Sequence, residues 1–127
     1  MKVLKSLASI QAQYEAVVRE IESLKVKQKA LKKAGIDYGT PNYKQGRYLR
    51  IVRPATDERG RQFEYIGADP EKQQVVLSAI ERGKEYDELD GRLVSLEKAL
   101  RRLDDDLYHL TNTFKWSHGL AIEDTTL

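Results

Sequence analysis

The 127-residue sequence predicts a mainly α-helical protein, in the order long helix, β-hairpin, long helix, with the two helices paired as an antiparallel coiled-coil hairpin. Three observations support this. In residues 75–114 and in residues 3–31, mostly apolar side chains recur at alternating intervals of four and three residues. All 3 prolines and five of the 8 glycines lie between these two stretches. Alternating steps average 3.5 residues, the heptad period that keeps one face of a helix against a partner.

The first helix is predicted over residues 3–34. Gly35 follows Lys32 and Lys33 and is typical of a helix C-terminus. The recurring positions are Val3, Leu7, Ile10, Tyr14, Val17, Ile21, Leu24, Gln28 and Leu31. Gln28 is the one polar member, and two interpretations stand. It fixes the register of the pairing, or, as the more favoured interpretation, it lies near the helix end and reaches water.

The segment between the helices predicts an irregular loop over residues 35–46 and a β-hairpin over residues 47–66. Residues 47–53 and 62–66 are rich in β-branched and aromatic side chains, and residues 54–60 between them have the composition of a turn. Side chains alternate along a strand, so Leu49 and Ile51 are expected to pack, whereas Tyr48 and Arg50 are expected to be exposed. Two strands are marginal alone, so the hairpin should pack on a helix or on a second copy.

The second helix is predicted over residues 70–115. Asp69 can cap free N–H groups and Pro70 suits the first helical position. Its recurring positions begin at Val75 and continue through Ala79, Arg82 and Tyr86. Gly83 and Gly91 fall off this line, so we expect them to weaken the helix without touching the pairing. Residues 116–127 are expected to form a loose tail.

The last eight recurring positions are all apolar, and we call them the leucine seam. They are Leu89, Leu93, Leu96, Leu100, Leu103, Leu107, Leu110 and Phe114. The second helix is longer than the first, so part of the leucine seam would have no intramolecular partner. We therefore expect self-association as a helical bundle, most simply a homodimer.

Composition excludes several classes of protein. With no Cys there is no disulfide framework and no thiolate chemistry. The first residues lack the apolar run of a secretory signal, and no run approaches the roughly 20 apolar residues of a membrane span, so we expect a cytoplasmic protein without a membrane partner. Asp104, Asp105, Asp106 and His109 have the residue types of a metal site, but their spacing on a charged stretch of helix favours a solvated helix face. No phosphate-binding loop or acid–base pair is found, so we expect no enzyme activity, no cofactor, no metal and no small-molecule substrate.

Charge points instead to a binding surface. Residues 1–61 carry 14 Lys and Arg against 6 Asp and Glu, whereas residues 62–127 carry 8 against 14. The bases gather at the end of the first helix and in the hairpin, a region we call the basic pole. Its candidate binding residues are Lys29, Lys32, Lys33, Lys44, Arg47, Tyr48, Arg50, Arg53, Arg59 and Arg61. Phosphate or acidic-partner binding and a solvated structural edge both remain open.

The order helix, hairpin, helix resembles that of the β-type prefoldin subunit. The resemblance is architectural, covers the helices and the hairpin, and carries over no residues. It implies a holdase chaperone as an alternative function, beside a structural scaffold. The first hypothesis is a non-enzymatic coiled-coil interaction protein whose basic pole binds nucleic acid or a nucleoprotein complex. A phage or mobile-element regulator, such as an inhibitor of a host defence complex, is one specific form of it.

Overall fold

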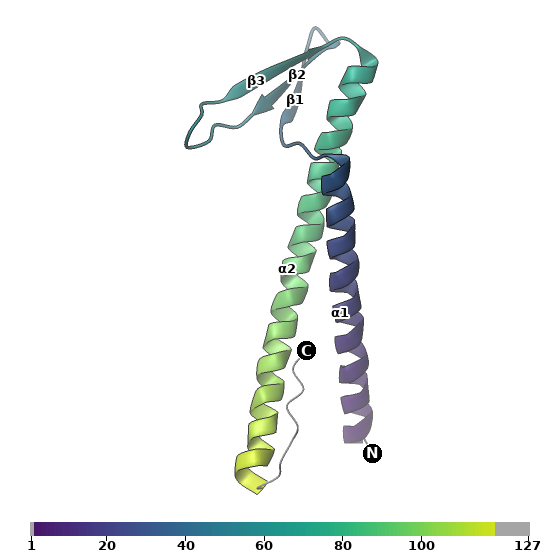
Figure 1. Ribbon diagram of the computed structural model, residues 1–127, viewed down its shortest axis with the longest axis vertical. Coiled ribbons are helices and arrows are strands. Elements are labelled where there is room, and N and C mark those ends of the chain that lie inside the picture. The colour runs from purple at the N-terminus through teal and green to yellow at the C-terminus, as the bar shows by residue number, and fades with distance from the viewer. Residues whose placement is uncertain (1, 119–127) are drawn as a thin grey trace. The chain divides into compact units, whose positions relative to one another are not determined.

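The computed structural model describes the backbone of residues 2–118 and the side chains of residues 5–116. The elements, in order, are α1 (Lys2–Ala34), β1 (Thr40–Lys44), β2 (Tyr48–Arg53), β3 (Gln62–Gly67) and α2 (Pro70–His118) (Figure 1). The protein is mainly helical, with a small antiparallel sheet between the two helices in the chain. The predicted order of helix, strands and helix is confirmed. The prediction of a loose tail lies outside the described residues from 119 onward, and α2 runs three residues past its expected end.

The chain divides into two compact units. Residues 23–91 form one, which we call the sheet unit, and residues 1–22 with 92–127 form the other, which we call the helical unit. Both helices contribute residues to each unit. We describe the two units separately.

Both inner helix ends in the sheet unit are capped as the sequence predicts. Gly35 follows α1 with a φ of 103°, and its N–H donates to the carbonyl of Leu31 at 3.1 Å. This is the left-handed residue that commonly ends a helix. At the start of α2, the N–H of Glu71 donates to the carboxylate of Asp69 at 3.0 Å, which satisfies one of the free donors of the first turn.

The sheet has three strands in the order β1-β2-β3, and both pairs are antiparallel. The β2–β3 hairpin is confirmed, but the prediction of an irregular loop over residues 35–46 is wrong for residues 40–44, which form β1. The connection from β1 to β2 has positive φ at both Gln45 (55°) and Gly46 (74°), as in a type I′ turn. The N–H of Arg47 donates to the carbonyl of Lys44 at 3.3 Å and closes this turn.

One face of the sheet packs on the first turns of α2. Leu49 and Ile51 are fully buried and cluster with Ile80. The predicted packing face is therefore confirmed, and each such side chain contributes about 1.5–3 kcal/mol of hydrophobic stabilisation. Gln73 adds a polar clamp, because its side-chain amide donates to the carbonyl oxygens of Arg47 at 2.8 Å and Gly67 at 2.7 Å.

The sheet changes which face of α2 is buried near its start. Val75 is 70% exposed, so its predicted place on the pairing face is wrong. The side chains that pack instead are those of Val76 and Leu77, together with Ile80. Gly83 is also buried, and the neighbours of its Cα side are Asp37 and Tyr38 of the α1–β1 linker rather than residues of the pairing face of α1. The periodicity of α2 alone does not reveal this change, because contact with the sheet decides which side of the first turns of α2 is buried.

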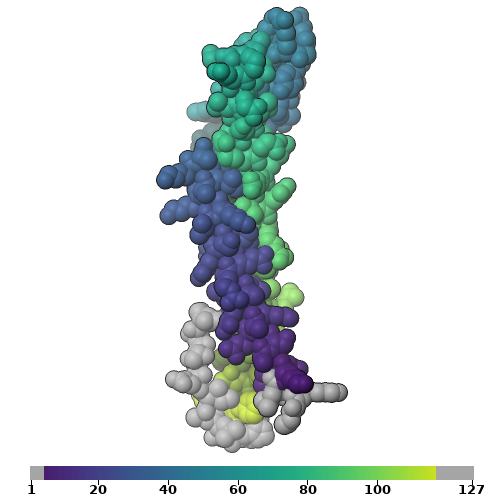
Figure 2. All heavy atoms as spheres, turned by 90° about the vertical axis from the view of Figure 1, so that its right-hand side faces the viewer, coloured from purple at the N-terminus to yellow at the C-terminus, as the bar shows by residue number. Residues whose placement is uncertain are grey.

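Gln28 is buried in the sheet unit, with 8% of its surface exposed. Its side-chain amide donates to the carboxylate of Asp90 at 3.2 Å and to the carbonyl of Tyr86 at 3.4 Å. The interpretation that Gln28 reaches water is therefore wrong. A space-filling view shows the α1 and α2 segments of this unit in direct contact (Figure 2).

In the helical unit, α1 and α2 are joined by polar contacts and an apolar stripe. The Tyr14 hydroxyl donates to Asp104 at 2.9 Å, and Arg92 pairs with Glu20 at 3.0 Å. From the leucine seam, Leu93 and Leu96 are buried. A shallow groove of about 190 Å³ follows, lined by Ile10, Gln13, Tyr14, Val17, Ala99, Leu100 and Leu103.

The last seam positions are partly exposed. Leu107 is 40% exposed, Leu110 47% and Phe114 38%. Over the part of the chain that the structure describes, neither helix contains a stretch long and apolar enough to cross a bilayer.

Candidate nucleic-acid interface

The sheet presents a second face that does not pack on α2, and we call it the outward face. Residues directly opposite each other in antiparallel strands point to the same side. The register places Tyr65 opposite Arg50 and Phe63 opposite Val52. From β1, Lys44 lies opposite Tyr48. The strand residues of the outward face are Thr40, Asn42, Lys44, Tyr48, Arg50, Val52, Phe63 and Tyr65.

Arginine side chains lie over aromatic rings of this face. The guanidinium carbon of Arg50 is 4.8 Å from the centroid of the Phe63 ring, and that of Arg61 is 5.5 Å from the same ring. Arg47 lies 5.0 Å from the Tyr48 centroid and donates to the Tyr48 hydroxyl at 3.0 Å. Such cation–π contacts at exposed sites contribute about 0.5–1 kcal/mol each. They hold three cationic groups on the sheet rather than leaving them to move freely in solvent.

The outward face is aromatic and free of strand carboxylates, and most of its residues are exposed, although Val52 within it is buried. Phe63 is 54% exposed and Tyr65 is 67% exposed. The single acidic residue within the three strands is Glu64, which lies opposite Ile51 and therefore on the packed side. Among the described residues, Arg47, Arg50 and Arg61 take part in no ion pair. The face is therefore positively charged and open to a partner.

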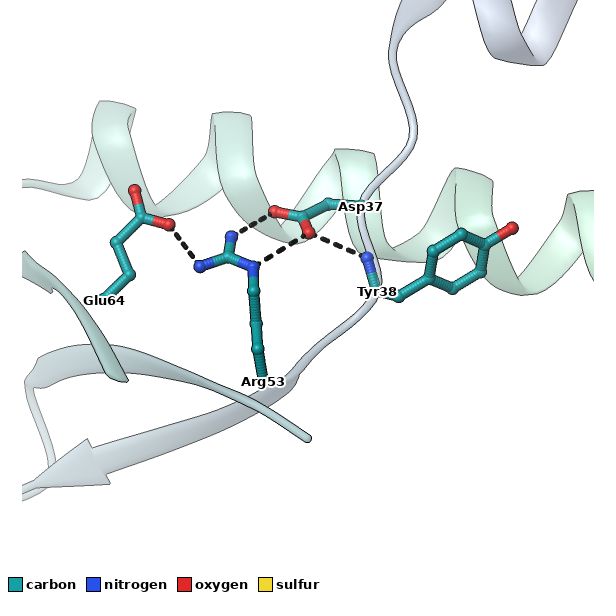
Figure 3. Close-up of polar contacts among 4 residues, drawn as sticks. All are labelled: Asp37, Tyr38, Arg53 and Glu64. Carbon is teal, nitrogen blue, oxygen red and sulfur yellow. Dashed lines mark hydrogen bonds and ion pairs between the residues drawn. The ribbon is translucent and has the colours of Figure 1, made fainter. Parts of the chain in front are cut away.

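Arg53 belongs to the basic pole in sequence but has a different environment. Its guanidinium lies between two carboxylates, 2.6 Å from Asp37 and 2.6 Å from Glu64 (Figure 3). The hydrogen bond to Asp37, then that to Glu64, raises the pKa of Arg53 above its usual value, although burial acts in the opposite direction. Arg53 thus joins β2 to the α1–β1 linker and to β3, and its charge is already compensated.

Other members of the basic pole lie on separate elements. Arg59 is in the β2–β3 loop, where it and Thr56 exchange backbone hydrogen bonds at 2.7 and 3.3 Å. Lys29, Lys32 and Lys33 are exposed on the last turns of α1. Side chains of this end of α1 protrude from the molecular surface in Figure 2. Among the described residues no hydrogen bond or ion pair joins these lysines to the outward face.

Sequence reasoning left Phe63 and Tyr65 out of the candidate binding residues. Their spacing of two in the chain places both on one face of a strand. Which face that is depends on the register with β2, and the eight-residue β2–β3 connection did not fix it. The register of the β2–β3 pairing also shifts between Leu49 and Arg50, so the partners on one side of this point do not predict those on the other side.

The acidic cluster of α2 does not form a metal-binding arrangement in the structure. Asp104 accepts the hydrogen bond from Tyr14. Within the described residues, no group of three or more His, Asp or Glu side chains is placed to hold a metal ion. What the outward face offers chemically is charge and stacking.

The chain matches no family model, no curated protein and no solved structure.

Proposed function

We propose that this chain is a non-enzymatic interaction protein that binds nucleic acid, alone or within a nucleoprotein complex, through the outward face of its sheet. The observation that carries the proposal is the set of three arginines held over aromatic rings on a face without strand carboxylates. Arginine side chains contact phosphates and release counterions, and exposed rings can stack on bases. The binding residues of this proposal are Arg47, Arg50 and Arg61 rather than the compensated Arg53.

The finer fold and the assembly belong to the same proposal. α1 and α2 form an antiparallel coiled-coil hairpin, and the open end of the leucine seam pairs with a second copy. The exposure of Leu107 and Leu110 supports this, because apolar side chains at heptad positions gain from being covered. A homodimer presents two outward faces, so two copies can bind one nucleic acid together.

A charge-reversal experiment tests nucleic-acid binding. The triple variant R47E/R50E/R61E is expected to lose binding by at least 100-fold in fluorescence anisotropy at about 0.1 M salt, because three attractive contacts become repulsive. K98E/R101E/R102E is the matched control, since it changes the same charge at exposed residues of α2. Helicity should be unchanged in both variants. Equal losses in the two variants would mean that net charge, not the outward face, governs binding.

A holdase chaperone is the second candidate, favoured by exposed apolar residues of the helical unit. Leu7 is 47% exposed, Ile10 43% and Leu110 47%. Such a surface could hold unfolded segments of other chains. Suppression of aggregation of a denatured client that persists at high salt would support this candidate, whereas binding to phosphates falls steeply with salt.

A further inference from the structure

Tyr65 is the most exposed ring of the outward face, and no arginine covers it. It is 67% exposed and lies directly opposite Arg50. The guanidinium of Arg50 turns to Phe63 instead. Among the described residues, Tyr65 takes part in no ring–ring or cation–π contact. Most of the Tyr65 side chain is therefore open to a planar ligand.

The surroundings of Tyr65 match the chemistry of a nucleotide chain. Phe63 and Tyr65 lie two residues apart on one strand, which separates them by roughly 6.6–6.8 Å. Arg50 and Arg61 lie over the neighbouring Phe63 ring, so cationic groups flank the open ring. Sheets that carry exposed aromatic residues recognise single strands by stacking two or three splayed bases. If an unpaired base stacked on Tyr65, the phosphates of the same nucleotide chain would lie near these arginines.

We infer that the outward face binds single-stranded nucleic acid, with Tyr65 stacking on an unpaired base and Arg47, Arg50 and Arg61 contacting phosphates. This inference rests on the proposed function and narrows its ligand. In a duplex the bases are stacked on one another and paired, so their faces cannot reach a ring on a sheet. A duplex would meet only the arginines.

The test compares Tyr65 variants on labelled oligo-dT and oligo-U of about 12 nucleotides, a length within the usual range of single-strand sites. Y65A is expected to bind about 10-fold more weakly, because it loses one stacking contact. Y65F keeps the ring and is expected to bind as the wild type does. Y43A is the matched control, since Tyr43 is 47% exposed but lies opposite Leu49, on the other side of the sheet. A duplex of the same length is expected to bind more weakly than either single strand.

Salt titration provides a second readout. Three phosphate contacts predict a slope of about −2 in log K against log salt for the single strands, at about −0.7 per contact. If Y65A binds like the wild type, or if the duplex binds as well as the single strands, the stacking inference is wrong. The proposed function would survive that result provided R47E/R50E/R61E still abolished binding. If no nucleic acid binds the wild type above the R47E/R50E/R61E level, both are wrong.

Discussion

Single residues of this protein have roles that their type alone does not reveal. Arg53 and Arg50 lie three positions apart in a basic stretch, yet Arg53 contacts Asp37 and Glu64 whereas Arg50 lies over Phe63. Arg53 is partly buried, and its ion pairs with two carboxylates connect β2 to the α1–β1 linker and to β3. Arg50 is exposed and, among the described residues, takes part in no ion pair. Alternation along β2 separates the two roles, because successive side chains point to opposite faces.

Tyr14 gives the helical unit a dependence on alkaline pH. Burial, then the hydrogen bond to Asp104 and the charge of that carboxylate, raise the pKa of Tyr14 above its usual value of 10.0. A raised pKa means that the folded chain holds the proton more tightly than the unfolded chain. The stability that Tyr14 contributes is therefore complete below pH 10 and is lost as the pH rises through the higher folded-state value.

Y14F tests this role, because it keeps the ring and removes the titrating hydroxyl. We expect its free energy of unfolding at pH 7 to fall by about 1 kcal/mol, the usual cost of one lost hydrogen bond. We also expect a shallower loss of stability above pH 10 than in the wild type. Urea unfolding followed by circular dichroism from pH 7 to pH 11 measures both. Y108F is the control, since Tyr108 is 62% exposed, and a Y14F profile that parallels the wild type would contradict the assignment.

Individual elements are held by close approach as well as by apolar burial. Gly83 of α2 lies against the α1–β1 linker, where a Cβ atom would come within 2.5 Å of the Asp37 carbonyl oxygen and 3.3 Å of the Tyr38 ring. The N–H of Asp37 also donates to the carbonyl of Ala79 at 3.0 Å. The linker is therefore fixed to the helix surface at a point where only glycine fits. A Cβ atom added at Gly91, on the same helix, would meet no atom of another element within 4 Å.

G83A and G91A are expected to change stability in opposite directions. Alanine in a helix interior is favoured over glycine by about 1 kcal/mol, so G91A should stabilise the chain by about that amount. G83A gains the same propensity but must displace the linker backbone, an overpacking cost of about 1–3 kcal/mol that we expect to prevail. Urea unfolding of both variants measures the difference. Equal stabilisation by the two would show that the linker does not pack tightly on Gly83.

The elements differ in how far the sequence predicts them. Both helices follow from their 3.5-residue period and their caps, since these signals are local. The strand β1 was missed because Pro41 and Asn42 have low strand propensity, and pairing with β2 overrides it. Gln45-Gly46 is the signal that could have found it, as a weaker form of the Asn-Gly turn. The faces of Phe63 and Tyr65 needed the register, which depends on contacts distant in sequence.

Charge is a property of the molecule as a whole. The Lys and Arg side chains of residues 1–61 could in principle be neutralised by the Asp and Glu side chains of residues 62–127. In the Arg53–Glu64 pair the first half supplies the positive charge and the second half the negative charge. In the Glu20–Arg92 pair the first half supplies the negative charge instead. These two pairs offset each other. Among the described residues, Arg47, Arg50 and Arg61 take part in none of the ion pairs, so their charge is not compensated in this way.

Self-association is the last property that the leucine seam predicts for the whole chain. In the helical unit Leu93 and Leu96 are buried, whereas Leu107 and Leu110 remain 40% and 47% exposed at the same heptad positions. Burying a fully exposed side chain of this size contributes about 1.5–3 kcal/mol, and Leu107 and Leu110 would each gain the part that corresponds to their exposed fraction if a second copy covered them. We expect the wild type to sediment as a dimer in analytical ultracentrifugation.

L107E/L110E tests this expectation, because two buried carboxylates would oppose the interface. The variant should sediment as a monomer and keep its helicity, and it should still bind single strands through its one outward face, with lower affinity because the second face is lost. V26E is the control, as Val26 is 69% exposed and lies off the pairing positions of α1. A monomeric wild type, or a dimer that L107E/L110E leaves intact, would show that the open seam is not the interface. Stacking on Tyr65 needs only one copy of the chain. The results expected for the Tyr65 variants therefore do not depend on whether the chain forms a dimer.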